Sequence, residues 1–125
     1  MRSAVERAGP EFDARLTALA TAYVRFATER AALLELMYAG KHRAGAGDVL
    51  RAAAERAFAT PIALIEAGQA GGAVVAGDTK RVAMVAWAAQ HGVAAMANGG
   101  LLGDARLDEV VADAVERLVL GLRPR

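Results

Sequence analysis

The sequence predicts an all-α fold, and three observations support this prediction. Hydrophobic residues make up 55% of the 125 residues, and alanine, the strongest helix former, dominates them. Large apolar residues recur at spacings of three and four, which is the period of one helix face. The β-branched residues form no run that alternates with polar residues, as a half-buried strand requires. Five helices in a single domain are therefore expected.

The first expected helix covers residues 12–30. One face of it carries the large apolar residues Phe12, Leu16, Leu19, Tyr23 and Phe26. Gly9 and Pro10 interrupt the chain just before it. Residues 1–11 are therefore interpreted either as a linker or as the tail of a longer connecting helix. A second helix, residues 31–39, is apolar nearly all round, which predicts burial on more than one side.

A basic, glycine-rich loop over residues 41–47 separates the second helix from the third, which is expected over residues 49–68. Asp48 has the residue type of an N-cap, whose side chain accepts a hydrogen bond from the first helical turn. Pro61 lies well inside this third helix. An internal proline removes one backbone hydrogen bond and crowds the preceding turn, so a kink is predicted there.

The last two helices are expected over residues 79–98 and 109–121, with Asp78 and Asp108 as their N-caps. The fourth helix is rich in alanine and glycine, so it allows close approach by another helix. The fifth carries more apolar surface than one neighbour would cover, because Val110, Val119 and Leu120 widen its stripe. This surplus predicts a four-helix bundle completed by a second copy. The alternative is an ordinary core within one chain.

Composition excludes several classes of function. The chain has no cysteine, so disulfides and thiolate sites are excluded. Its net charge is +1 with both signs interleaved, unlike the concentrated basic face of nucleic-acid binders. No apolar stretch is long enough for a bilayer and no signal peptide is present, so a cytoplasmic protein without membrane contact is expected. The single serine, Ser3, and the absence of metal-ligand spacings lead us to expect no catalytic residue, no metal and no cofactor.

Three stretches of the chain resemble the C-terminal domain of TetR-family transcription regulators. The first is Ala22-Tyr23-Val24-Arg25-Phe26-Ala27-Thr28-Glu29, followed by Leu33, Leu36 and Met37. The second is Gly77-Asp78 and then Trp87-Ala88-Ala89-Gln90-His91-Gly92, which is similar to the Trp…His-Gly (WHG) signature of one class of these domains. The third is Gly99-Gly100-Leu101-Leu102 with the terminal helix. The resemblance covers residues 12–122, which we expect to form one effector-binding and dimerisation domain.

The resemblance implies a specific division of labour. The first four helices would enclose a cavity for a hydrophobic small-molecule effector, and the last two would form the homodimer interface. Effector binding would then shift a linked DNA-reading head by population shift. The sequence before Phe12 has no room for the family's N-terminal helix-turn-helix domain. We therefore expect DNA binding only through that missing head, whether it is absent by truncation or by nature.

The candidate ligand contacts are the large apolar residues near the signature, together with its histidine. They are Tyr23, Phe26, Met37, Phe58, Ile62, Met84, Trp87 and His91. Each has core packing as its alternative, and His91 would then bond a backbone carbonyl rather than a ligand. Gln90 is expected to face either the cavity or the dimer partner. The competing functional hypotheses are a structural dimerisation module without a ligand and a small helical enzyme that uses His91.

Overall fold

The computed structural model describes residues 2–40 and 47–125, without the side chains of 37–40, 47, 49–51, 53 and 54. Every regular element in this part of the chain is a helix, which confirms the all-α prediction. The helices are α1 (Arg2–Arg7), α2 (Phe12–Glu29), α3 (Ala31–Gly40), α4 (Gly47–Ala70), α5 (Thr79–Asn98) and α6 (Leu107–Leu122). The five expected helices correspond to α2–α6, with ends within two residues of those predicted. The short α1 lies within the segment interpreted as a linker or helix tail.

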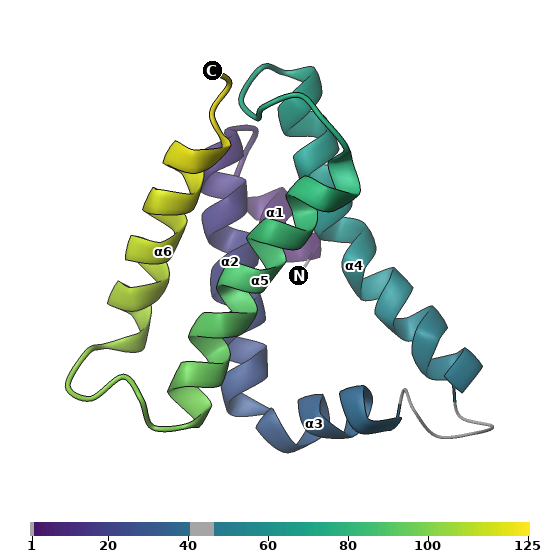
Figure 1. The fold of residues 1–125 in the computed structure, drawn as a ribbon, viewed down its shortest axis with the longest axis vertical. Helices are drawn as coiled ribbons and strands as arrows, with labels where there is room; N and C mark the ends of the chain where they lie inside the picture. Colours follow the sequence, from purple (N-terminus) through teal and green to yellow (C-terminus); the bar gives the residue numbers. More distant parts are fainter. Residues whose placement is uncertain (1, 41–46) are drawn as a thin grey trace.

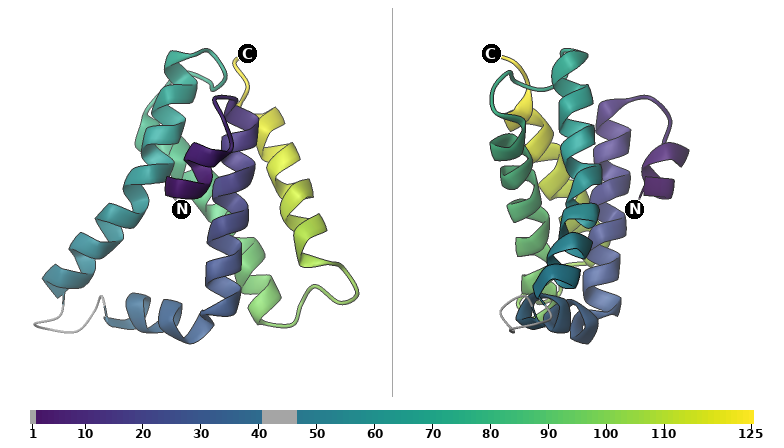
Figure 2. Two further views of the ribbon diagram at one scale, coloured as in Figure 1. Left: turned by 180° about the vertical axis from the view of Figure 1, so that it is seen from behind. Right: turned by 90° about the vertical axis from the view of Figure 1, so that its right-hand side faces the viewer.

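Helices α2, α5 and α6 run side by side and form the centre of the fold (Figure 1). Helix α4 packs against α2 and α5, while its N-terminal half slants away from them. Helix α3 crosses the end of this assembly, and α1 packs on the outside of α2 (Figure 2). The C-terminus of α6 lies beside the α4–α5 connection, where the Val75 amide donates to the Leu122 carbonyl over 2.6 Å.

The core is built from the apolar faces of these helices. Helix α6 contributes one residue per turn, and its buried positions are Val111, Val115, Val119 and Leu122. Helix α2 contributes its expected stripe, with Leu16, Leu19 and Tyr23 buried. Val5 of α1 joins the same core, so the segment before residue 12 packs against the domain. None of the helices in the described ranges is sufficiently long and apolar to cross a bilayer.

Glycine closes α4 and α5 in the same way. Gly100 has a φ of +71°, and it lets the Leu101 amide turn back to the Met96 carbonyl over 2.9 Å. Gly72, with a φ of +83°, does the same after α4. This is the Schellman arrangement, which satisfies carbonyls left unpaired at a helix C-terminus. Helix α5 therefore ends at Asn98, where the fourth helix was predicted to end.

One of the three predicted N-caps is confirmed and two are wrong. The Asp78 carboxylate accepts the Arg81 amide over 3.1 Å, as an N-cap does. Helix α4 begins at Gly47 and α6 begins at Leu107, so Asp48 and Asp108 lie inside the first turn instead. A carboxylate there still stabilises the helix, because it faces the positive end of the helix dipole. Aspartate is thus favoured both at the N-cap and in the first helical turn, so the residue type alone does not show which of the two positions it occupies.

Helix α4 continues through Pro61 without interruption. In its last turn, Gly68 allows two side chains to approach the backbone closely. A Cβ atom placed on Gly68 would lie 2.5 Å from Val74 and 3.0 Å from the Phe12 ring. This close contact anchors the C-terminal half of α4 to the start of α2 and to the α4–α5 connection. The basic loop expected over residues 41–47 lies almost wholly outside the described residues.

Candidate functional site

Three aromatic side chains from three helices meet at Trp87 of α5. The ring of Tyr23, from α2, lies 4.4 Å from the Trp87 ring between centroids, with an interplanar angle of 44°. The ring of Phe58, from α4, lies 5.1 Å away and meets Trp87 edge-on at 70°. Such tilted and edge-on pairs are favourable beyond the apolar area that they bury. Trp87 therefore joins α2, α4 and α5 at one point.

His91 lies one helical turn after Trp87 and connects α5 to α2 through a hydrogen bond. Its Nδ1 atom is 2.9 Å from the hydroxyl oxygen of Tyr23. Which of the two groups donates depends on the tautomer of the imidazole. The bond spans 68 residues of sequence and holds α5 in register with α2.

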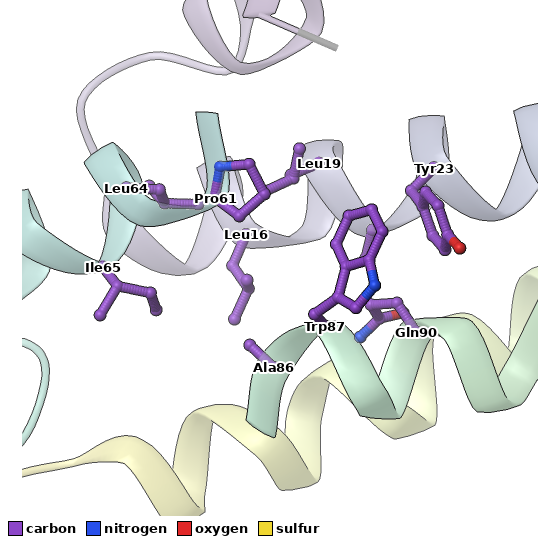
Figure 3. Close-up of a pocket in the computed structure, with 10 residues that line it drawn as sticks. Leu16, Leu19, Tyr23, Pro61, Leu64, Ile65, Ala86, Trp87 and Gln90 are labelled. Carbon is purple, nitrogen blue, oxygen red and sulfur yellow. The ribbon is translucent and has the colours of Figure 1, made fainter. Parts of the chain in front are cut away.

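A small cavity opens beside this aromatic cluster (Figure 3). Its volume is about 20 Å³, which is the space of roughly one water molecule. Helices α2, α4 and α5 all contribute to its wall. The lining residues are Leu16, Leu19, Ala20, Tyr23, Pro61, Leu64, Ile65, Ala86, Trp87 and Gln90. None of them carries a charge, so the cavity favours neutral and mainly apolar contents.

Among the lining residues, Gln90 carries a buried amide side chain. Its side chain is only 5% exposed, and neither its amide nitrogen nor its amide oxygen has a hydrogen-bond partner among the described residues. Buried polar groups are nearly always paired, because leaving one unpaired costs free energy. The amide itself is buried beside the cavity and is not exposed to it, because no polar atom of the described residues lies on the cavity surface. Gln90 therefore borders the cavity only through its carbon atoms.

Two of the predicted ligand contacts, Tyr23 and Trp87, line the cavity directly. Others lie around it, since Phe26, Phe58 and Ile62 are partly buried against the same core. The structure therefore brings most of the predicted set into one region.

One predicted contact, Met84, falls elsewhere, and His91 reaches the site through its bond to Tyr23 and does not line the cavity. Met84 is 55% exposed and does not line the cavity. The side chain of Met37 lies outside the described residues. Sequence reasoning omitted Leu16, Leu19 and Leu64 from the ligand contacts. Their helical spacing marked the first two as buried, but spacing does not distinguish a cavity wall from filled core.

The outward face of α5 carries an unusual stripe of small and apolar residues. We call Val85, Ala88, Gly92 and Met96 the outer stripe, because their spacing places them on one helix face. Val85 is 59% exposed and Met96 is 45% exposed, and a Cβ atom added to Gly92 would meet nothing within 4 Å. On α6, Val110, Ala114 and Leu118 form a half-buried apolar row packed against the core. Leu120 instead lines a shallow groove toward Thr17 of α2.

Comparisons with known proteins place most of the chain in one family. A family model described as "Tetracyclin repressor-like, C-terminal domain" matches residues 16–122. A solved structure of a protein with unknown function from Rhodococcus sp. RHA1 is similar, with a TM-score of 0.92 and 40% sequence identity. The similarity covers 97% of this chain but only 62% of that chain, so the present sequence spans less than two thirds of its relative. No curated protein matches the sequence.

Proposed function

Because the chain belongs to the family of tetracycline-repressor-like C-terminal domains, we propose that it senses a small, mainly apolar effector in the cavity beside Trp87. The family comprises ligand-binding and dimerisation domains of transcription regulators. In this proposal, the domain pairs with a second copy through α5 and α6. Effector binding would then alter the DNA affinity of a DNA-reading domain to which the chain is linked in the whole protein.

The position of the cavity is the observation that carries this proposal. Its wall is shared by three helices, so a ligand inside it contacts α2, α4 and α5 at once. Helix α4 contributes Pro61, Leu64 and Ile65 to the wall, all from its C-terminal half. A ligand that binds best when α4 is displaced shifts the population toward that arrangement. A cavity between packed helices can therefore act as a sensor, whereas a surface groove would not move them.

The outer stripe supports the dimerisation part of the proposal. Exposed Val85 and Met96 flank small residues that let a partner helix approach closely. A monomer rarely exposes a row of apolar residues along one helix face without using it as an interface. Two copies related by a two-fold axis would pair α5 and α6 with their counterparts and form a four-helix bundle.

The arrangement favours binding over catalysis. The described residues contain no group of three or more histidine, cysteine, aspartate or glutamate side chains placed to hold a metal. His91 bonds the Tyr23 hydroxyl and does not itself line the cavity, whose lining residues are uncharged. An enzyme that used His91 as a base would need a second polar group aimed at the same substrate atom.

A thermal-shift screen against hydrophobic small molecules tests the sensing function. A compound that binds only the folded state raises the melting temperature by mass action. We expect at least one compound to raise it, and we expect the effect to be lost in Trp87→Leu but kept in Met84→Leu, whose side chain is exposed. If no compound raises the melting temperature, or if both variants respond alike, the cavity is not the sensor. A structural dimerisation module would then be the better description.

A further inference from the structure

The two halves of α4, before and after Pro61, are packed very differently. Among the described side chains of this helix, none before Pro61 is buried. Pro61 itself, Leu64, Ile65 and Gly68 are all buried. The N-terminal half slants away from α2 and α5, whereas the C-terminal half lies against them (Figure 1). A segment that buries little surface separates from its domain at a lower free-energy cost than a segment that buries much.

The C-terminal half of α4 is held in place by several independent contacts. Leu64 and Ile65 belong to the hydrophobic core, and Gly68 makes the close contact with the start of α2. The Gln69 side-chain nitrogen donates to two carbonyls of the α4–α5 connection, over 3.1 Å each, and its oxygen accepts from the Thr79 hydroxyl over 2.6 Å. This half of the helix is therefore fixed to both α2 and α5.

The backbone of α4 is weakened where the two halves meet. Proline has no N–H group, so the Ala57 carbonyl, four residues before Pro61, lacks its helical donor. The proline ring also crowds that carbonyl. Helix α4 runs through this position without a break, but one hydrogen bond fewer joins its two halves than joins any other pair of turns. Proline is a common cause of bending in helices, so this is where α4 bends most easily.

Phe58 ties the N-terminal half of α4 to the rest of the domain. Its ring meets the Trp87 ring edge-on, with the centroids 5.1 Å apart. Phe58 lies three residues before Pro61, so a bend at residues 57–61 carries it away from Trp87. We propose that residues 47–60 of α4 are a lid, hinged at residues 57–61, that lifts Phe58 off Trp87 and admits the effector to the cavity. This proposal rests on the sensing function of the cavity.

The size of the cavity explains why the site needs such a lid. A volume of about 20 Å³ does not accommodate even a benzene ring, so a ligand must gain space when it binds. Leu64 and Ile65 line the cavity on the fixed half of α4 and stay in place. The additional space therefore arises at Trp87, where Phe58 leaves. An effector that fills this space holds the lid open, because it binds the open arrangement better than the closed one.

Amide hydrogen exchange, followed by mass spectrometry on the intact chain without ligand, tests the hinge. Residues 55–60 lie beyond the first turn of α4, whose amides lack helical partners in any case. After correction for intrinsic rates, we expect their amides to exchange at least about tenfold faster than those of residues 64–70. Pro61→Ala restores the missing hydrogen bond, so exchange at residues 55–60 should slow by about fivefold. Phe58→Ala removes the contact with Trp87 and should accelerate it by about tenfold.

Pro124→Ala is the matched control, because it removes an exposed proline that lies beyond α6. This variant should leave the exchange of both halves of α4 unchanged, and the effects of Pro61→Ala and Phe58→Ala should be confined to residues 55–60. Equal exchange rates in the two halves of α4 would overturn the lid. An unchanged rate in Pro61→Ala, or an equal response in Pro124→Ala, would do so too. If Pro61→Ala does not fold, as judged by circular dichroism, Phe58→Ala decides in the same way.

The thermal-shift screen separates failure of the lid from failure of the proposed function. If a compound raises the melting temperature but the two halves of α4 exchange alike, the sensing function stands and the lid is overturned. If residues 55–60 exchange faster but no compound raises the melting temperature, the sensing function fails. The hinge itself then stands, and its role in ligand entry is overturned.

Discussion

Replacing Gln90 with methionine is expected to stabilise the folded protein. Methionine has a side chain of similar length but no amide group. The Gln90 side chain is 5% exposed, and both ends of its amide are unpaired among the described residues. Burying an amide without a partner costs about 1–3 kcal/mol in protein mutational data. Methionine fills the same space without that cost, so we expect the free energy of unfolding to rise by about 1–2 kcal/mol. For a domain of this size, that is roughly 3–10 °C in melting temperature.

Urea unfolding followed by circular dichroism measures this change, at one fixed protomer concentration because dimerisation also affects stability. Gln69→Met is the control with the opposite expected sign. It breaks three hydrogen bonds at the α4–α5 connection, so stability should fall by about 1–2 kcal/mol. If Gln90→Met were neutral or destabilising, the Gln90 amide would have to be paired in solution, and the reasoning from an unpaired buried amide would fail.

Three further substitutions test packing, assembly and the inter-helix bond. Gly68→Ala should lower the urea-unfolding free energy by about 1–3 kcal/mol, because the new Cβ would lie 2.5 Å from Val74; increased stability would contradict this close packing. Gly92→Arg should abolish the dimer in sedimentation velocity while leaving the helical circular dichroism unchanged, and a persisting dimer would exclude the outer stripe as interface. Tyr23→Phe should cost about 0.5–1.5 kcal/mol in the same urea assay through the lost bond to His91, and unchanged stability would show that this bond contributes nothing.

The helices and the core stripe of this domain were predictable because they depend on local spacing. Leu16, Leu19 and Tyr23 recur at intervals that can face only one side of a helix, and all three are buried. The ends of α4 and α5 were predictable from glycine, because the turn that closes each helix requires a residue with a positive φ. The bond between Tyr23 and His91 was not predictable, since no local pattern relates residues 68 positions apart.

Helix α5 shows where sequence reasoning about the site reached its limit. Met84 and Gln90 each lie three residues from Trp87, on opposite sides of it along the chain. Met84 is largely exposed and Gln90 is buried, although methionine is the more apolar of the two. On an alanine-rich helix, several faces are compatible with burial, and only the positions of α2, α4 and α6 decide between them. The sequence therefore identified the right helix, but it did not predict which of its residues point into the core.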